Sequence, residues 1–451
     1  MKSKSVVILF AAVICAIICA SSAFALTRYK VTDLGTLGGG YQSYMTAAIN
    51  EQGQVVGTGT GYDSNGNYFS RGFIWDKETG MVEIGSFGGS ESRVFDISDT
   101  GQVVGLSDYP GGGTQNRHAF LWQNGSLIDL GNGAATGINN NNQIVGTSPF
   151  GTGVVWQVVD NNIVKIAFGD NDTRPQAIND LGQIVGCSWG ASPHGQAFVW
   201  DQVNGMQYLP LMPGYVGSVA TDINQSGQVV GNGMSDTLFY IQKPAVWMDG
   251  VMEYIGGAQG STYAINDLGQ AVGEFNQVYG TTPHAFIWNS KNGIQDLNEL
   301  VIPGHGFDLI TWATGINNRG QIATDANLNG KSHAVLLTPI SEVAIDIKPG
   351  VYPNSINLGA KGTVPVAILT TDDFDATTVD PTTVRFAGAP AIKRTMEDVD
   401  SDGYLDVLLH FDTQELNLDA SNTEATLTGM TDDRIAIVGT DSVNIVPKRK
   451  K

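Results

Sequence analysis

The chain has 451 residues, enough for roughly two or three domains, and a formal charge of −20 at pH 7. An acidic surface repels nucleic acids and anionic membranes, so we expect neither as a partner, whereas it suits divalent cations. Charged residues make up only 15% of the chain while glycine numbers 57. This balance is typical of short strands joined by many turns.

The first 25 residues predict a secretory signal peptide. Lys2 and Lys4 precede an apolar run over 6–20, and the small-residue site 23–25 (AFA) follows. No later apolar run is long enough to span a bilayer. We therefore expect an exported protein that is extracellular, periplasmic or held at the cell surface.

Cys187 is the one cysteine that follows the predicted leader, because Cys15 and Cys19 lie inside it. Neither an intrachain disulfide nor a cysteine zinc cluster is then possible in the mature protein. We expect its stability to come from core packing, with metal ions as a possible addition.

A Gly-Gln-hydrophobic-Val-Gly motif, or a near relative, recurs seven times. Its glutamines stand at positions 54, 102, 143, 183, 228, 270 and 321, so the repeat is roughly 45 residues long. Each unit has a short segment ending in Ile-Asn or Ile-Ser, a turn, this motif, a variable loop and a box such as 118–122 (HAFLW). The heptapeptide AINDLGQ occurs twice in identical form, at 177–183 and 264–270.

Four short strands per repeat of this length predict the blade of a β-propeller. Asn179 can bond its own backbone two residues on and so start the turn, and Gly182 supplies the positive φ that closes it. Asn142 stands where the other units have this glycine, and asparagine tolerates the conformation best after glycine. The tryptophan that ends the box is large enough to fill the wedge between blades.

The ends of the repeat region predict how the ring closes. Segment 29–35 (YKVTDLG) matches the last strand of a blade, and the seventh unit ends after 333–338 (HAVLLT) without one. Pairing the two would complete the blade and remove an exposed sheet edge, a phase shift that an open β-solenoid would not need. We predict an all-β fold with a seven-bladed β-propeller over 26–340.

The repeat stops near position 341, and 341–447 predicts a separate β-sandwich. Strand-like runs cover 363–371, 382–387, 404–411 and 433–438. The basic residues 448–451 (KRKK) read as a tail without the apolar segment of an anchor.

Several segments resemble known families. The region of about 29–340 resembles the HAF repeat, an extracellular repeat family of bacteria and archaea. The resemblance is carried by 33–39 (DLGTLGG), 178–186 (INDLGQIVG) and 118–122 (HAFLW). That resemblance implies no general enzymatic activity, and only the second and sixth units keep a full His-Ala-Phe. Most of 343–415 resembles a recurrent C-terminal module of secreted microbial proteins. The resemblance is carried by 345–358 (IDIKPGVYPNSINL), 364–369 (VPVAIL) and 398–411 (DVDSDGYLDVLLHF).

The loop 398–406 (DVDSDGYLD) predicts a structural calcium site, because hard oxygen ligands at positions one, three, five, seven and nine of a loop suit Ca²⁺. The predicted ligands are the carboxylates of Asp398, Asp400, Asp402 and Asp406 and the main-chain carbonyl of Tyr404. Position twelve of the loop is Leu409 rather than glutamate, so the loop is not an EF-hand. The alternative is an acidic hairpin turn without an ion. Segment 63–67 (DSNGN) is a second candidate, whose alternative is an ordinary polar turn.

Aromatic side chains in and near the predicted loops are candidates for stacking on sugar faces. These are Tyr62, Tyr68, Tyr109, Trp189, Tyr279 and Trp312. The alternative is that the rings cover loop hydrophobics. Arg93 and Arg174 stand at equivalent places, where they could meet an anionic ligand near the channel or could be solvated or salt-bridged.

His118, His284 and His333 occupy equivalent positions at the start of the third strand, which predicts a structural hydrogen bond rather than catalysis. No Ser/His/Asp set stands at useful spacing. We therefore predict an exported, monomeric, non-catalytic protein that binds an extracellular glycan or a surface protein. The alternative is an extracellular polysaccharide hydrolase or lyase with its site in the propeller channel.

Overall fold

The computed structural model describes residues 27–111, 116–159, 162–170, 172–190, 192–211, 213–235, 242–248, 250–256, 259–276, 282–372, 374–432 and 434–446. The predicted leader 1–25, Tyr279 and the basic tail 448–451 lie outside these residues. The chain divides into two compact units. One holds Thr27–Ser341 with Asp433–Ala436, and the other holds Glu342–Asp432 with the residues from Ile437 onward.

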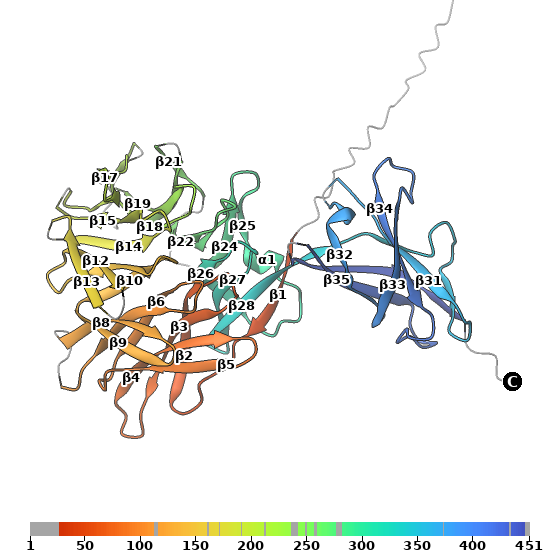
Figure 1. Ribbon diagram of the computed structural model, residues 1–451, viewed down its shortest axis with the longest axis horizontal. Coiled ribbons are helices and arrows are strands. Elements are labelled where there is room, and N and C mark those ends of the chain that lie inside the picture. The colour runs from red at the N-terminus through yellow and green to blue at the C-terminus, as the bar shows by residue number, and fades with distance from the viewer. Residues whose placement is uncertain are drawn as a thin grey trace, which may run out of the picture. The chain divides into compact units, whose positions relative to one another are not determined.

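The first unit contains six four-stranded antiparallel sheets, each built from four successive strands (Figure 1). We number them blades 1 to 6. Blade 1 is β2 (Tyr41–Ile49), β3 (Val55–Tyr62), β4 (Tyr68–Asp76) and β5 (Gly80–Gly85). Blade 2 is β6 (Ser92–Ile97), β7 (Val103–Asp108), β8 (Arg117–Gln123) and β9 (Ser126–Asn132). Blade 3 is β10 (Ala134–Ile138), β11 (Gln143–Thr147), β12 (Gly153–Val159) and β13 (Asn162–Phe168).

The remaining three blades follow the same order. Blade 4 is β14 (Thr173–Ile178), β15 (Ile184–Ser188), β16 (Gln196–Asp201) and β17 (Gly205–Tyr208). Blade 5 is β18 (Tyr215–Ile223), β19 (Val229–Ser235), β20 (Gln242–Met248) and β21 (Val251–Tyr254). Blade 6 is β22 (Gln259–Ile265), β23 (Ala271–Asn276), β24 (His284–Asn289) and β25 (Gly293–Asp296).

The last repeat contributes three strands of its own and borrows a fourth. After the short helix α1 (Leu297–Leu300) come β26 (Leu309–Ile316), β27 (Ile322–Leu328) and β28 (Lys331–Glu342). Strand β1 (Arg28–Asp33) pairs antiparallel with β28, from Arg28 opposite Ile340 to Asp33 opposite Val335. The predicted pairing of the N-terminal strand is therefore present. We call β26, β27, β28 and β1 the closing sheet.

The turn after each blade's first strand has the geometry predicted from AINDLGQ. The N–H groups of Leu181 and Gln183 donate to Asn179 Oδ1 at 3.1 and 2.9 Å. Gly182 has a φ of +76°, and Asn142 takes a φ of 60° in blade 3. We call the side of the propeller that carries these turns the turn face.

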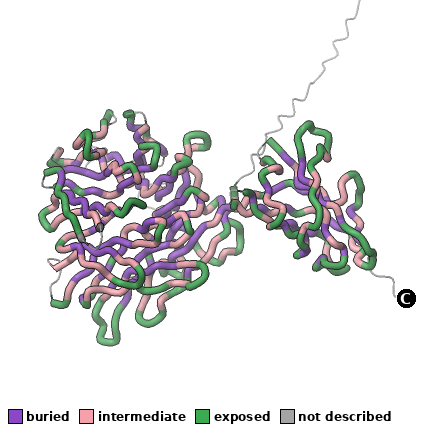
Figure 2. The backbone as a smooth tube through the Cα atoms, viewed as in Figure 1, coloured by how far each residue is buried: buried purple, intermediate pink, exposed green. Residues whose placement is uncertain are grey.

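The propeller core consists of hydrophobic clusters shared by neighbouring blades. Trp156 is fully buried among Val104 and Leu121 of the preceding blade, and its indole N–H donates to Leu130 O at 3.0 Å. Trp247 makes the equivalent bond to Pro210 O. The predicted role of the tryptophan as a wedge is confirmed. Figure 2, in which the backbone is coloured by residue burial, shows the buried stretches of the chain in purple.

The second unit is a mostly antiparallel sheet structure with one hydrophobic core. Its strands are β29 (Ile345–Ile347), β30 (Ser355–Asn357), β31 (Thr363–Ile368), β32 (Val379–Phe386), β33 (Ala389–Glu397), β34 (Asp406–Asp412), β35 (Glu424–Thr431), β36 (Ala436–Ser442) and β37 (Asn444–Val446). They order as β36-β35-β32-β33-β34-β31-β29, while β30 pairs in parallel with β37. Strands β33 and β35 were not among the predicted runs. Residues of β33 alternate weakly in burial and are mostly exposed, whereas β35 alternates clearly but carries few large apolar residues.

Candidate ligand and metal sites

A closed belt of hydrogen bonds joins the turns of neighbouring blades. The residue after each turn asparagine, or after Ser98 in blade 2, donates its N–H to a side-chain oxygen of its counterpart in the next blade. The bonds run Glu51→Asp99, Asp99→Asn140, Asn140→Asp180, Asp180→Gln225, Gln225→Asp267, Asp267→Asn318 and Asn318→Glu51, at 2.8–3.1 Å. The last bond returns to the first blade, and all seven residues line a cavity of about 200 Å³.

The turn asparagines make a second set of bonds between blades, which the sequence reading missed. Asn179 Nδ2 donates to Asn224 O at 3.1 Å, and Asn317 Nδ2 donates to Asn50 O at 3.0 Å across the closure. The asparagine therefore shapes its own turn through Oδ1 and holds the next blade through Nδ2. Repetition of asparagine at one place in the unit was the available signal.

Each first strand of the propeller carries a β-bulge three residues before the asparagine or serine of its turn. The bulged residues are Ala47, Phe95, Thr136, Gln176, Thr221, Tyr263 and Thr314. A bulge re-aims one side chain relative to the regular alternation of the strand. All seven of these residues line one cavity of about 480 Å³, which we call the channel cavity.

The threonines of this wall hold the blades together. The hydroxyl groups of Thr136, Thr221 and Thr314 donate to Pro175 O, Thr262 O and Thr46 Oγ1 at 2.7–2.9 Å. These hydroxyls are committed to joints between blades. Ligand selectivity therefore falls to the side chains that differ from blade to blade.

Those differing side chains are mainly uncharged. Burial first, and then the negative charge of Glu274, raise the pKa of Tyr263 to about 12, so its phenol stays neutral at physiological pH. Gln176 adds an amide, and Phe95 adds an apolar ring. Among the described lining residues, Arg93 is the charged one, and its guanidinium lies 2.6 Å from Glu91.

Three aspartates join neighbouring blades beside the channel cavity, and of these Asp325 is fully buried while Asp96 and Asp222 are partly buried. Asp96 and Asp222 accept the N–H groups of Ile138 and Ile265 at 2.8 Å, and Asp325 accepts that of Thr46 at 2.7 Å. Burial raises the pKa of each aspartate to about 7. These aspartates were not predicted, although an aspartate in the apolar end of a strand (FDIS, TDIN) was a usable signal for the first two.

The loop aromatics divide into open and covered rings. Tyr62 and Tyr68 pack edge to face at 5.8 Å and are both half exposed, and Tyr68 lines the channel cavity. Tyr109 stacks on Phe87 at 5.0 Å and donates its hydroxyl to Asp129. Tyr109 thus follows the alternative reading, in which a ring covers the loop.

Two predicted ligand residues lie against each other. The Arg174 guanidinium lies 4.5 Å from the centre of a Trp189 ring, and it is 4.0 Å from Asp172. Neither Arg174 nor Trp189 is among the residues that line the channel cavity. Trp312 is 37% exposed on β26 and is also not among them.

The repeated histidines join the third and fourth strands. His118 Nδ1 lies 2.9 Å from Asp129, and His284 Nδ1 lies 2.6 Å from Asp296. In blade 1 the same positions hold the ion pair of Arg71 with Glu83. The predicted structural hydrogen bond is therefore confirmed for His118 and His284.

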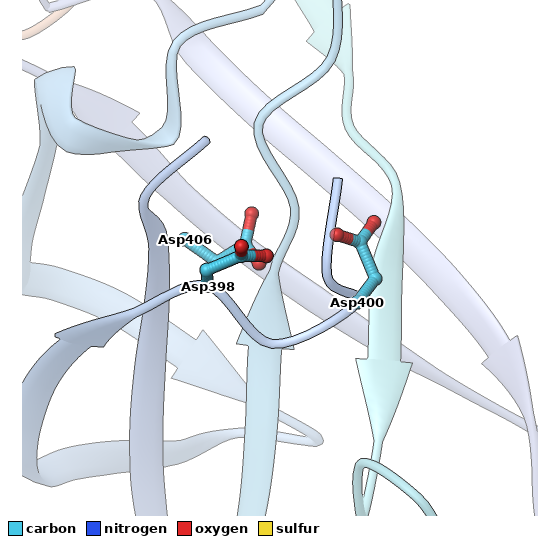
Figure 3. Close-up of side chains that lie close together, drawn as sticks. All are labelled: Asp398, Asp400 and Asp406. Atoms are coloured by element: carbon cyan, nitrogen blue, oxygen red, sulfur yellow. The ribbon is translucent and has the colours of Figure 1, made fainter. Parts of the chain in front are cut away.

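The acidic loop of the second unit brings three of the four predicted carboxylates together (Figure 3). Ligand oxygens of Asp398, Asp400 and Asp406 lie within 4.8 Å of one another. Two ligands at about 2.4 Å from one Ca²⁺ can be no farther apart than this, so the set fits the ion. Asp402 is not in this set, and its Oδ1 accepts the N–H of Tyr404 instead.

Asp406 anchors this loop. It is fully buried, and its two carboxylate oxygens accept the N–H groups of Thr370 and Val399 at 2.7 and 2.8 Å. Each oxygen keeps a second lone pair for a cation. Desolvation, and then the negative charges of Asp402, Asp406 and Asp398, raise the pKa of Asp400.

Segment 63–67 behaves as an ordinary turn. Asp63 Oδ1 accepts the N–H groups of Asn65 and Asn67, and Asp63 Oδ2 accepts Asn67 Nδ2. These are the bonds of an ordinary polar turn.

The strand order and the shared central cavity define an all-β protein built on a β-propeller of repeated four-stranded blades. No protein-family model matches the chain, and no curated protein matches it. No helix among the described residues is long and apolar enough to cross a membrane.

Several solved structures are similar in fold. The RRP9 WD40 repeats have 11% identity and a TM-score of 0.43, with 69% of this chain and 97% of that chain covered. The Cps50 (Swd1) β-propeller domain of Myceliophteria thermophila has 12% identity and a TM-score of 0.41, with 68% and 99% covered. Trypanosoma rangeli sialidase has 10% identity and a TM-score of 0.32, with 66% and 54% covered.

Proposed function

We propose that the chain is an exported, non-catalytic binding protein of the HAF-repeat kind, with a glycan or surface-protein ligand in the channel of a seven-bladed propeller. The closing sheet is the seventh blade. The pairing of β1 with β28, the bond from Asn317 to Asn50 and the belt bond from Asn318 to Glu51 support this count. Each joins the last repeat to an N-terminal segment.

The observation that carries the proposed function is the convergence of seven bulged residues on one cavity. The turns and the core repeat from unit to unit, whereas the bulged side chains vary among alanine, phenylalanine, threonine, glutamine and tyrosine. A cavity of about 480 Å³ falls within the size range of ligand sites. Side chains that differ at the cavity, in blades whose turns and core are otherwise repeated, are expected of a recognition site.

The alternative hydrolase or lyase needs an acid and a base that face the ligand. The described lining residues include no carboxylate and no histidine. Glu274, whose pKa burial raises to about 7, influences Tyr263 but is not among the lining residues. This lining supports binding over catalysis.

A glycan and surface-protein array probed with the mature chain tests the proposal. Gln176→Ala and Tyr263→Phe should each weaken any signal that the channel produces. Tyr208→Phe, on the exposed outer strand β17, is the matched control and should leave binding unchanged. Retention of full signal by both channel variants, or product release from a bound glycan, would contradict the proposal.

For the second unit we propose a β-sandwich braced by a structural calcium ion. Asp398, Asp400 and Asp406 would hold the ion, and Asp406 already joins the loop to the backbone at Thr370. The ion would neutralise carboxylates that otherwise repel one another. N-terminal sequencing of the secreted protein, expected to begin at Leu26, tests export.

A further inference from the structure

A second cavity lies on the turn face between blades 3 and 4, away from the channel cavity. It measures about 580 Å³ and shares no residue with the channel cavity. Blade 3 contributes residues of β11, β12 and β13, and blade 4 contributes the turn 178–184 and residues 200–204. We call it the blade 3–4 groove.

The groove contains hydrogen-bond donors that bond nothing in the part of the chain that the structure describes. The side-chain oxygens of Gln143 and Gln183 accept their turn asparagines at 2.8 Å, but their Nε2 groups bond no described residue. In blades 1 and 2 the corresponding Nε2 groups donate to Asp76 and Gln123 within their own sheets. Gln157, the blade 3 counterpart of these two acceptors, likewise has no partner in the described chain.

The groove also offers an aromatic ring and apolar edges. Trp200 packs against Phe168 at 4.6 Å between ring centres, and its indole N–H bonds no residue that the structure describes. Ile166, Leu181 and Val203 are exposed apolar residues of the lining. Aromatic and aliphatic surface beside free amide donors suits a molecule with apolar faces and many hydroxyl acceptors.

The charges of the groove disfavour an anionic ligand. The described lining has no lysine, arginine or histidine to attract an anion. The Asp180 carboxylate accepts the N–H and Nδ2 of Asn140, and that of Asp201 accepts the N–H and Nδ2 of Asn204. Both carboxylates are therefore engaged by the protein.

We infer that the blade 3–4 groove binds a neutral oligosaccharide, with a sugar face on Trp200 and hydroxyl groups accepting from Gln143, Gln157 and Gln183. This site is independent of the channel proposal, because the two cavities share no residue.

The two copies of AINDLGQ provide a matched pair of variants. Leu181 and Leu268 occupy the same place in the turn and are 70% and 67% exposed, but only Leu181 lines the groove. Tryptophan fluorescence and calorimetry would follow titration of the full mature chain with neutral di- to tetrasaccharides of glucose, galactose and N-acetylglucosamine. Leu181→Glu and Gln157→Ala should each weaken binding by about tenfold, and Leu268→Glu should not.

Four outcomes would overturn the inference. The first is no binding of any neutral saccharide by the wild type at millimolar concentration, and the second is binding of uronate-containing saccharides alone. The third is equal affinity of the Leu181→Glu and Leu268→Glu proteins. Gln176→Ala in the channel should leave the titration unchanged, and loss of binding in that variant alone would assign the saccharide to the channel instead. Gln157→Ala keeps the test decisive if Leu181→Glu fails to fold.

Discussion

His333 Nδ1 lies 3.7 Å from Asp33 Oδ2, and the two residues come from opposite ends of the repeat region. His118 with Asp129 and His284 with Asp296 occupy the same places within single blades. Asp33 therefore stands where the last strand of a blade places its aspartate. This equivalence supports the proposal that β1 completes a seventh blade from the other end of the chain.

Removing β1 should cost far more than removing the Asp33 charge. A chain that starts at Leu34 leaves the edge of β28 unpaired, and an unpaired edge invites association. We expect aggregation or a large loss of thermal stability, measured by size-exclusion chromatography and thermal melts. Asp33→Asn keeps the strand and should cost less than about 1 kcal/mol, because the pair is partly exposed. Similar stability of the two proteins would contradict closure by β1.

Asn317→Ala should destabilise the ring strongly. Asn317 is buried, accepts two N–H groups of its own turn and donates to Asn50 O in blade 1. Leaving such groups unpaired costs about 1–3 kcal/mol for each. Ser98 fills the same place in blade 2, so Asn317→Ser should be the milder change in urea unfolding. Serine, like alanine, lacks the Nδ2 group that reaches Asn50, so the reverse order would show that the turn bonds accepted by the side chain are unimportant.

Stability should fall as pH rises from about 4 to about 7. Asp96, Asp222 and Asp325 have pKa values raised from 3.8 to about 7, so in this window the folded state holds protons that the unfolded state releases. Each aspartate lowers the free energy of unfolding by at most about 1.4 kcal/mol for each pH unit in this window. Urea unfolding at pH 5 and pH 7.5 measures the difference.

Variants separate these aspartates from other carboxylates. Asp325→Asn should make the free energy of unfolding depend less steeply on pH between about pH 4 and about pH 7. Asp129→Asn should not, because desolvation there is outweighed by the bonds from Gly131, His118 and Tyr109, which lower its pKa. The contribution of Asp129 is present above its unfolded pKa and is lost at lower pH. If the pH dependence of stability is unchanged in Asp325→Asn, the raised pKa of Asp325 does not contribute to it.

Calcium should raise the melting temperature of the full chain, and a chelator should reverse the effect. At a free concentration one hundred times Kd, binding to the folded state alone adds about 2.7 kcal/mol. Asp400→Asn should abolish most of the shift. Asp402→Asn should preserve it, since Asp402 lies outside the set of three carboxylates. If both variants lose the shift in melting temperature equally, Asp402 is a ligand after all and the site has four carboxylates. If calcium does not shift the melting temperature of the wild type, the site does not exist.

Local chemistry made much of this fold predictable from the sequence. The Asn-x-x-Gly turn depends on one asparagine and one residue at positive φ, both visible in AINDLGQ. The tryptophan wedge and the match of 29–35 to a blade strand follow from periodic apolar residues. These features involve neighbours in the chain or an exact repeat, so one sequence is sufficient to predict them.

The rest was decided by tertiary structure. Gln176 and Tyr263 face the channel because a bulge re-aims them against the alternation that a strand pattern predicts. The bond from Asn179 to Asn224 and the burial of Asp325 depend on where the next blade lies. Spacing alone placed Asp402 among the calcium ligands, but the folded loop turns its carboxylate to the Tyr404 N–H. Such contacts form across the ring or across a loop, and the direction of a side chain there depends on backbone geometry that residue spacing does not encode.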